Sequence, residues 1–222
     1  MSTSKLDYWH WVDALYMVMP VMVKMYDITK NPLYLEKLHQ YLTVTDSIMY
    51  DREVGLYYRD AKYPYPFHKT INGKKDFWSR GDGWAFAAFA KVLKQLPAED
   101  KYREEYITRF QTMAKSIAAC QQPEGYWTRS LIDPEQAPGP ETSGTALFTY
   151  GFLWGINNGL LNADIYSPIV EKAWNYLKTT ALQADGKIGY INLSEKKQYQ
   201  GRWWMLIHVS IFGIGAFFIS CL

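Results

Sequence analysis

Cysteine is scarce in this chain of 222 residues, which contains only Cys120 and Cys221. Two cysteines at this spacing fit neither a metal cluster nor a disulfide framework, and we interpret both as buried thiols. The chain also lacks a glycine-rich phosphate loop, a His-Glu-x-x-His pair and the Gly-x-Ser-x-Gly elbow of serine hydrolases. These absences predict no metal site and exclude P-loop enzymes, zinc peptidases of that motif and elbow-type esterases.

An excess of charge of either sign is absent as well. Lysine and arginine together number 24 against 22 aspartates and glutamates, which gives a formal net charge of +2. Proteins that hold nucleic acid by its phosphates need a concentrated basic surface. The near balance of charge gives no sign of such a surface, and we exclude a nucleic-acid partner.

A signal peptide is not evident, because residues 1–6 do not carry a basic-then-apolar pattern. We therefore expect a cytoplasmic location by default, with the periplasm as the alternative if the natural N-terminus lies further upstream. Residues 203–222 are almost wholly apolar and long enough to span a bilayer. His208 and the small residues Gly213 and Gly215 favour a buried helix over a membrane span.

Aromatic residues are unusually abundant at 17% of the chain, with 9 Trp, 18 Tyr and 10 Phe. One interpretation is a large aromatic core. The other is a sugar-binding site, because the faces of pyranose rings stack on indole and phenol rings. Composition alone does not decide between them.

Helical periodicity dominates the sequence and predicts about seven helices in which apolar helices alternate with amphipathic ones. Asn31 and Pro32 supply a cap and a first-turn proline for the second helix, and Ser167 and Pro168 open the sixth. The predicted helices span residues 8–29, 32–50, 83–96, 104–121, 143–157, 168–182 and 203–222.

A short glycine-aromatic segment follows each amphipathic helix, at residues 55–58, 125–127 and 189–191. Repetition of a helical hairpin plus a long loop is typical of closed or stacked hairpin arrays. Apolar helices would form an inner ring, amphipathic helices an outer ring, and all long loops would gather at one end, where a site is expected. The sequence therefore predicts one all-α domain, residues 1–222, of the (α/α)6-toroid type. Seven helices do not close such a ring, so we expect an incomplete toroid whose exposed inner helices could pair two copies into a homodimer.

Three motifs, in order, resemble those of glycoside hydrolase family 105, the unsaturated rhamnogalacturonyl hydrolases, which are related to the unsaturated glucuronyl hydrolases. They are WVDALYM at residues 11–17, FWSRGDGW at 77–84 and ETSGTA at 141–146, with GYW at 125–127 between the last two. The resemblance covers the chain from Tyr8 onward. It implies that the chain is the C-terminal two-thirds of the family domain, without its N-terminal hairpins.

Asp13 is the candidate catalytic residue. The positions three and four residues from it carry aromatic rings, an imidazole and a thioether: Trp9, His10, Tyr16 and Met17. A carboxyl group among such neighbours is desolvated, which raises its pKa toward that of a general acid working near neutral pH. The residues alone leave an alternative open, a water-facing acid near the start of a helix. The resemblance implies the catalytic role, because Asp13 matches the family's proton donor.

Three residues are candidates for contacts to the sugar. By the resemblance, Trp11 and Arg80 match a tryptophan and an arginine that meet the substrate, and Trp84 matches an aromatic platform. The fork of a guanidinium suits the carboxylate of a uronic acid. The alternative for Arg80 is an arginine on the surface.

Asp82 lies where an N-cap is expected, between Gly81 and Gly83, which would let the backbone approach a ligand closely. Family members commonly carry Asn at this position, another good cap. We therefore interpret Asp82 as structural rather than as a second catalytic acid.

The loop from Tyr57 to His68 is dense in tyrosines and charged residues. The chain carries Arg59 where better-known family members have a histidine, which puts the substrate in question. Arg59 or His68 could take over that binding role, although a plain loop histidine is equally consistent for His68. Asp60 either assists or belongs to a solvated turn.

The third motif and the segment before it add further candidates. Trp127 is either a sugar-stacking platform or a core tryptophan, and the sequence does not separate the two. Thr142 and Ser143 are predicted to cap the helix that follows them.

The resemblance implies hydration of the 4,5 double bond of an unsaturated uronic acid at the non-reducing end of pectin-derived, rhamnogalacturonan-type oligosaccharides. Asp13 would act as general acid and base, no metal or organic cofactor is implied, and the partner is an acidic oligosaccharide. Single-carboxyl chemistry of this kind differs from glycoside hydrolysis by paired carboxylates.

Two alternatives remain open at this stage. One is a different toroid sugar enzyme, such as a lyase or an epimerase, although epimerases rely on paired histidines and the 4 His here are poorly placed for that. The other is a non-catalytic glycan-binding remnant, because the family has a second functional aspartate in its N-terminal third that finds no counterpart here.

Overall fold

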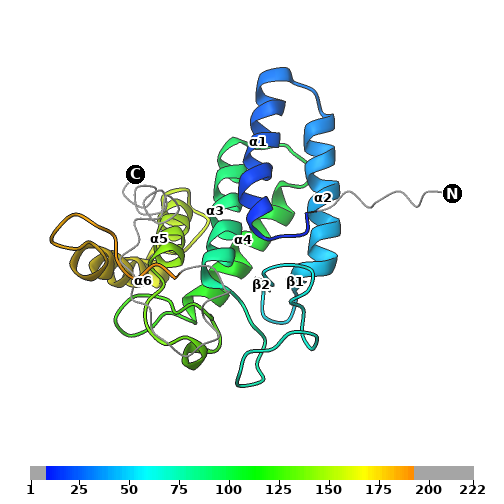
Figure 1. Cartoon of the computed structure of the whole chain (residues 1–222). Coiled ribbons are helices and arrows are strands. Elements are labelled where there is room, and N and C mark those ends of the chain that lie inside the picture. Colours follow the sequence, from blue (N-terminus) through cyan, green and yellow to red (C-terminus); the bar gives the residue numbers. More distant parts are fainter. Residues whose placement is uncertain (1–8, 193–222) are drawn as a thin grey trace.

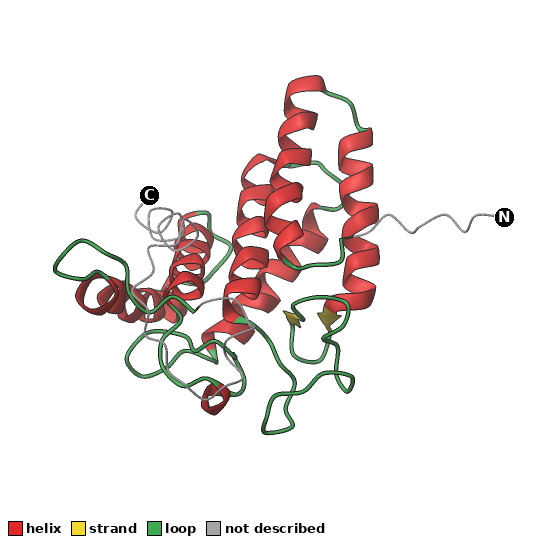
Figure 2. Ribbon diagram, in the orientation of Figure 1, coloured by secondary structure: helices red, strands yellow, loops and turns green. Residues whose placement is uncertain are grey.

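Helices dominate the computed structural model, which describes residues 9–192 (Figures 1 and 2). The predicted all-α class is confirmed, and the predicted helix at residues 203–222 lies outside the described residues. One antiparallel pair of two-residue strands is present, β1 (Tyr50–Asp51) and β2 (Leu56–Tyr57). The helices are α1 (Asp13–Thr29), α2 (Leu33–Met49), α3 (Ser79–Gln95), α4 (Arg103–Ala118), α5 (Thr142–Asn157) and α6 (Ala163–Tyr176), with the short turns η1 (Pro134–Gln136) and η2 (Leu177–Ala181).

The six helices form three consecutive hairpins, α1–α2, α3–α4 and α5–α6 (Figure 1). Helix α3 lies between α1 and α5 and packs against both, while α2, α4 and α6 each pack behind the helix that precedes them. The predicted alternation of inner and outer helices is therefore correct for this part of the chain. Helix α3 is buried almost along its whole length, as an inner helix flanked on three sides must be.

Aromatic rings fill the space between the inner and outer helices. Phe86 of α3 stacks on Phe110 of α4 at 4.5 Å between ring centroids and meets Phe152 of α5 edge-on at 5.2 Å. All three side chains are fully buried. Each such ring contributes roughly 1.5–3 kcal/mol through the apolar surface that it removes from water. Much of the unusual aromatic content thus belongs to the core.

Glycines allow the inner helices to approach one another closely. A methyl group added at Gly81 would lie 2.9 Å from Val12 Cγ1, and one at Gly83 would lie 3.0 Å from Leu147 Cβ. These two glycines therefore bring α3 against the segment before α1 and against α5. The prediction that they admit a ligand to the backbone is wrong for this structure, because protein atoms already occupy the space beside them.

The starts of two helices differ from the prediction. Helix α3 begins at Ser79 with Trp78 as its N-cap, so Asp82 lies inside the first turn and is not the cap. Helix α6 begins at Ala163 rather than near Ser167, because the side chain of Asn162 accepts a hydrogen bond from the backbone N–H of Asp164 at 2.8 Å.

The cap of α5 also differs from the prediction, which named Thr142 and Ser143. The N-cap is Glu141, whose side chain accepts a hydrogen bond of 2.6 Å from the backbone N–H of Gly144. Glu141 is fully buried, so this cap lies inside the protein rather than at its surface.

Long loops gather at the end of the hairpins where α1, α3 and α5 begin (Figure 2). The backbone N–H of Ser79 donates to Arg129 O at 2.9 Å, and that of Glu141 donates to Trp127 O at 2.8 Å. The loops are thus hydrogen-bonded to the first turns of the inner helices and to one another. The predicted collection of loops at one end is correct.

Helix α1 presents exposed apolar side chains at Met17, Val21 and Ile28. This exposure agrees with the expectation that an inner helix at one end of the row is only partly covered. The pairing of two copies through such helices stays a prediction. Within residues 9–192, no helix combines the length and the apolar character that crossing a membrane requires.

The close contact between α3 and α5 makes a testable prediction at Gly144. A methyl group there would lie 2.8 Å from Ser79 Oγ, 2.9 Å from Ser79 C and 3.0 Å from Arg80 N. We expect Gly144→Ala to lower the free energy of unfolding by about 1–3 kcal/mol, because backbone atoms must shift to admit it. Urea denaturation followed by circular dichroism measures the change.

Gly189→Ala is the matched control for Gly144→Ala. Its nearest neighbours would be side-chain atoms of Gln183, at 2.9 and 3.3 Å, which can move aside at little cost. Equal losses of stability in the two variants would contradict the claim that close packing of the inner helices limits position 144.

Candidate functional site

Asp13 is the first residue of α1, and a backbone ladder holds the segment before it. The N–H of Val12 donates to Arg59 O at 2.9 Å, and Trp11 forms an antiparallel bridge with Asp60. The first turn of α1 is thus aligned on the residues that follow β2. This brings the predicted catalytic residue beside the predicted binding residue Arg59.

The carboxyl group of Asp13 is largely buried, and its Oδ2 atom has no hydrogen-bond partner. Burial raises the pKa of Asp13 above its usual value. The backbone, the positive charges of Arg80 and Arg59 and a hydrogen bond from Trp11 oppose this rise without cancelling it. A largely buried carboxyl that has an oxygen without a hydrogen-bond partner and two guanidinium groups nearby is suited to give and take a proton.

Arg59 is fixed by its neighbours into a flat stack. Its guanidinium carbon lies 4.4 Å from the ring centroid of Trp11 and 4.5 Å from that of Tyr63. The Nε and Nη2 atoms each lie 3.0 Å from Asp60 Oδ2, so Asp60 assists Arg59 rather than lying in a solvated turn. Trp11 remains 45% exposed, which leaves part of its ring available to a ligand.

Arg80, in the first turn of α3, is buried and does not lie on the surface. Its Nη1 atom donates to Glu141 Oε1 at 3.2 Å, Ser143 Oγ at 3.1 Å and Asn192 O at 3.0 Å. Its guanidinium also lies 4.5 Å from the ring centroid of Trp78. Within residues 9–192, the hydrogen bonds of Arg80 all run through Nη1.

Glu141 is a site residue that the sequence analysis missed. One carboxylate oxygen pairs with Arg80 and accepts from Ser143 Oγ at 2.6 Å, while the other accepts from Gly144 N. Glu141 therefore caps α5 and fixes Arg80 at the same time. The available signal was an acidic residue directly before a predicted helix, since carboxylates favour the N-terminal end of a helix.

Asp82 is fully buried and accepts a hydrogen bond of 2.8 Å from the backbone N–H of Tyr57 on Oδ1. Its Oδ2 atom has no partner, and burial raises the pKa of this carboxyl well above its usual range. Burial therefore favours the neutral acid form of Asp82 over the carboxylate. Asp82 ties β2 to α3, which supports the structural interpretation although not the capping one.

Trp84 lies one turn further along α3 and is only 5% exposed. Its ring lies 4.6 Å from the ring of Tyr16 of α1. Tyr16 follows Asp13 in α1 and Trp84 follows Arg80 in α3, so each ring lies about one turn further along its helix. A role for Trp84 as an open platform stays a prediction, and in this structure only a small part of the ring is accessible.

Trp127 is a core residue. It is 0% exposed, its indole N–H donates to Ile117 O at 2.7 Å, and its ring packs on Phe148 and Phe152. The prediction that it stacks on a sugar is wrong for this structure, because the fully buried ring presents no face to a ligand.

His68 belongs to a side-chain network behind Arg59. Its Nε2 lies 3.0 Å from Asp76 Oδ2, and its ring lies 3.9 Å from that of Tyr63, whose hydroxyl accepts from Arg59 at 3.1 Å. Asp76 also pairs with Arg129. His68 is therefore more than a plain loop histidine, and it contacts the site through Tyr63. Tyr63 and Asp76 were missed because their partners lie far along the chain or in an irregular loop.

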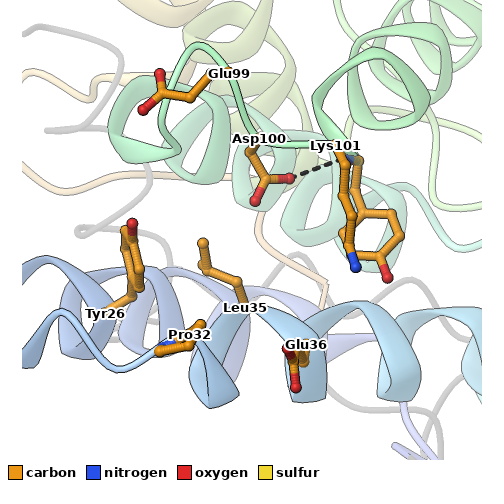
Figure 3. A pocket seen from close by; sticks show the side chains of 8 residues that line it. Tyr26, Pro32, Leu35, Glu36, Glu99, Asp100 and Lys101 are labelled. Atoms are coloured by element: carbon orange, nitrogen blue, oxygen red, sulfur yellow. Dashed lines mark hydrogen bonds between the residues drawn. The ribbon is translucent and has the colours of Figure 1, made fainter.

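A pocket lies at the opposite end of the first hairpin, where the α1–α2 turn meets the α3–α4 connection (Figure 3). Tyr26 lines it and is 13 residues along α1 from Asp13, which corresponds to about 20 Å at the helical rise. Its walls carry Glu36, Glu99 and Asp100 against a single ammonium group, that of Lys101. This acidic lining disfavours an anionic sugar, so the pocket is not the candidate site.

Within residues 9–192, no three His, Cys, Asp or Glu side chains lie close enough together to hold a metal ion. Cys120 is a free, partly buried thiol, and burial raises its pKa to about 11. It therefore stays protonated, which agrees with its interpretation as an inert thiol.

A row of helical hairpins with inner and outer helices, whose long loops gather at one end, is typical of an α/α toroid. The sequence matches Glycosyl Hydrolase Family 88 over residues 2–221, and the chain belongs to that family. The resemblance to family 105 extends to the fold, because a solved possible member of that family from Salmonella enterica superposes with a TM-score of 0.76. That structure is 21% identical and the match covers 95% of this chain and 55% of the other.

A curated relative from Alteromonas sp. (strain LOR), an unsaturated 3S-rhamnoglycuronyl hydrolase, is 36% identical over 183 residues. That match covers 82% of this chain and 44% of the relative. The chain spans about half the length of the curated relatives it matches.

Two solved structures are much more similar. A family 88 glycosyl hydrolase from Bacteroides vulgatus is 90% identical with a TM-score of 0.94, over 99% of this chain and 63% of the other. A protein described as a polysaccharide lyase is 65% identical with a TM-score of 0.93, over 99% of this chain and 62% of the other. These matches establish the fold, while their two descriptions name different reactions.

The raised pKa of the buried Asp82 carboxyl gives a testable prediction. Asp82→Leu removes the acceptor of the Tyr57 N–H and should lower the free energy of unfolding by about 1–3 kcal/mol. Asp82→Asn keeps a carbonyl oxygen at that place and should remain close to the parent. Urea denaturation at neutral pH separates the two. If Asn were as damaging as Leu, an ionised carboxylate would be required and the neutral acid would be wrong.

Proposed function

We propose that the protein belongs to the unsaturated rhamnogalacturonyl-type branch of these enzymes and hydrates the double bond of a 4,5-unsaturated uronic acid. The substrate is the non-reducing end of a pectin-derived, rhamnogalacturonan-type oligosaccharide. The observation that carries the proposal is Asp13, a carboxyl with a raised pKa and an unpartnered, buried oxygen between two guanidinium groups. The names of the curated relatives support the reaction, since they describe unsaturated 3S-rhamnoglycuronyl hydrolases.

The other acids of the site are committed to partners, which supports a single-carboxyl mechanism. Glu141 pairs with Arg80, and Asp60 pairs with Arg59. Asp82 is buried, has a raised pKa and accepts a hydrogen bond from the backbone of Tyr57. Asp13 is therefore the acid of this cluster that is available to exchange a proton with a substrate.

The reaction uses Asp13 twice. Protonated Asp13 gives its proton to C4 of the vinyl ether, which leaves positive charge shared by C5 and the ring oxygen. A water molecule then forms a bond to C5 and returns a proton to the Asp13 carboxylate. The resulting hemiketal opens and releases the aglycone sugar, so one water is consumed and the acid is regenerated.

The uronate carboxylate is proposed to bind the free edge of Arg80. Glu141 and Ser143 hold the opposite edge through Nη1, so little rotational freedom is lost on binding. Trp11 and Arg59 supply a flat surface on the other side of Asp13, where the pyranose ring would lie. Binding through an already oriented guanidinium gives the site its preference for acidic sugars.

A lyase is the competing reaction, because one structure at 65% identity is described as a polysaccharide lyase. The two reactions change the same chromophore in opposite directions. A lyase creates the conjugated unsaturated uronide, so the absorbance of the solution rises. Hydration removes the conjugated double bond, so the absorbance falls. Incubation with unsaturated rhamnogalacturonan disaccharide and, separately, with intact polymer therefore decides between them. Loss of absorbance from the disaccharide supports the proposal, and a gain from the polymer alone contradicts it.

Asp13→Asn should abolish turnover of the unsaturated disaccharide while leaving the fold intact, because an amide cannot donate the proton. In the parent, kcat/KM should fall as the pH rises through the raised pKa of Asp13, since only the protonated acid is active. Absorbance decay over a pH series measures both effects. Activity within a few-fold of the parent in Asp13→Asn would reject the assignment.

Stability of the same variant checks the pKa independently of activity. The folded-state pKa of Asp13 lies above 3.8, so at neutral pH ionised Asp13 opposes folding and Asp13→Asn should raise Tm. Below 3.8 the carboxyl is protonated in both folded and unfolded chains, and the gain should disappear. A gain that is the same at all pH values would contradict a raised pKa.

Arg80→Lys tests the proposed uronate contact. It keeps a positive charge beside Glu141 but removes the free edge of the fork, so we expect KM for the disaccharide to rise about tenfold or more. Arg103→Lys is the control, because Arg103 binds backbone carbonyls of Leu93 and Leu96 outside the site. Steady-state kinetics compare the two variants, and an unchanged KM in Arg80→Lys would remove Arg80 from substrate binding.

A further inference from the structure

The loop that leaves the site after β2 has an unusual charge. Residues 59–75, which we name the cationic loop, contain five lysines and arginines and a single acidic residue. The chain as a whole is nearly balanced, with 24 basic and 22 acidic residues. The excess of positive charge is therefore local, and it begins beside Asp13.

Three of the five cations are paired. Arg59 binds Asp60, Lys74 binds Asp133 at 3.3 Å, and Lys75 binds Asp51 and Glu53 at 2.7 Å. The other two, Lys62 and Lys69, are exposed and have no carboxylate partner within residues 9–192. Their ammonium groups are the ones available to an anion from outside.

Exposed aromatic rings lie between these two lysines. Phe67 is 89% exposed, Tyr65 beside it is 44% exposed, and the ammonium of Lys69 lies 5.1 Å from the ring centroid of Tyr65. A phenylalanine this exposed gains nothing from packing in this structure. Tyr65 and Lys69 thus lie together on the exposed stretch of residues 62–69, which also carries Phe67 and Lys62.

Hydrogen bonds hold the loop in place and so hold these rings in position. The N–H of Phe67 donates to Pro64 O at 3.0 Å, and that of Thr70 donates to Lys74 O at 2.9 Å. Asn72 donates to Asp133 Oδ1 at 3.0 Å, and His68 is anchored on Asp76. The surface is therefore preformed, which lowers the entropy lost when a ligand binds.

The base of the loop is continuous with the candidate site. Arg59 stacks on Trp11 and on Tyr63, and Tyr63 contacts His68, the residue next to Phe67. Side-chain contacts therefore connect Trp11, next to the first turn of α1, with the exposed part of the loop.

We propose that Lys62, Tyr65, Phe67 and Lys69 form a second subsite that binds the aglycone end of an acidic oligosaccharide. The rings stack on a pyranose of the oligosaccharide. The lysines pair with the carboxylate of a uronate further along the oligosaccharide, because acidic and neutral sugars alternate in a rhamnogalacturonan. This inference rests on the proposed function and adds a preference for tetrasaccharides over disaccharides. Acidic oligosaccharide is favoured over a protein partner because the rings lie in sequence between two ammonium groups that have no carboxylate partner within residues 9–192.

Calorimetric titration tests the subsite directly in the full 222-residue chain. The probes are the unsaturated disaccharide and tetrasaccharide from a lyase digest of rhamnogalacturonan, titrated into Asp13→Asn so that neither is consumed. The tetrasaccharide should bind more tightly than the disaccharide. Adding Phe67→Ala should weaken tetrasaccharide binding by about fivefold or more, as expected for an aromatic anchor, and leave disaccharide binding unchanged.

Charge is tested with Lys62→Gln and Lys69→Gln together, which should weaken tetrasaccharide binding and reduce its dependence on salt. The matched controls are Ile28→Ala, an exposed apolar residue at the far end of α1, and Lys172→Gln, an exposed lysine of α6. Both controls should leave the two affinities unchanged.

The outcomes separate this inference from the proposed function. Equal affinities for the two probes, no binding of either, or a tetrasaccharide affinity indifferent to Phe67 would each overturn the subsite. The proposed function is judged by turnover of the disaccharide in the parent chain, which does not involve Lys62, Tyr65, Phe67 or Lys69. Turnover with an insensitive Phe67 rejects the subsite alone, and Phe67-dependent binding without turnover rejects the reaction alone.

Discussion

Close packing of α3 between α1 and α5 is the constraint on which the described structure depends. Gly81, Gly83 and Gly144 remove the side chains that would hold these helices apart, and the buried glycines have backbone or core atoms within about van der Waals distance. Because the three helices touch near their first turns, Asp13, Arg80 and the residues after Glu141 come together without any loop having to carry them. The loops then close around an arrangement that the helices have already fixed.

Within that arrangement, three acids each face an arginine. Glu141 faces Arg80, Asp60 faces Arg59, and Asp76 faces Arg129. Such buried pairs add little net stability, since the cost of desolvation offsets much of the attraction, but they fix side-chain directions. Asp13 stands outside the pairing, near two arginines that are already neutralised by other acids. The pKa of Asp13 is therefore raised mainly by the cost of placing a charge in a poorly solvated position, and not by a hydrogen-bonding partner.

The sequence was sufficient to predict the hairpin repeat, the alternation of inner and outer helices and the collection of the long loops at one end. Local patterns carry this information: periodicity gives the helices, and the motif around Asp13 gives its neighbours one turn away. The sequence was not sufficient for Glu141, which pairs with a residue 61 positions away, nor for Trp127, whose residue type is the same in a core as on a sugar platform. The start of α3 was placed too late because glycines in its first turn resemble a loop when their packing partners are unknown.

The common orientation of the three inner helices has an electrical consequence. Helices α1, α3 and α5 all begin at the loop end, so the positive ends of three macrodipoles point toward the same small region. Each is equivalent to roughly half an elementary charge, and unlike a lysine it cannot be deprotonated or moved aside. The backbone alone therefore gives this end of the protein a fixed positive potential. Attraction for anions is a property of the hairpin arrangement itself, and the side chains decide which anion is held and what happens to it.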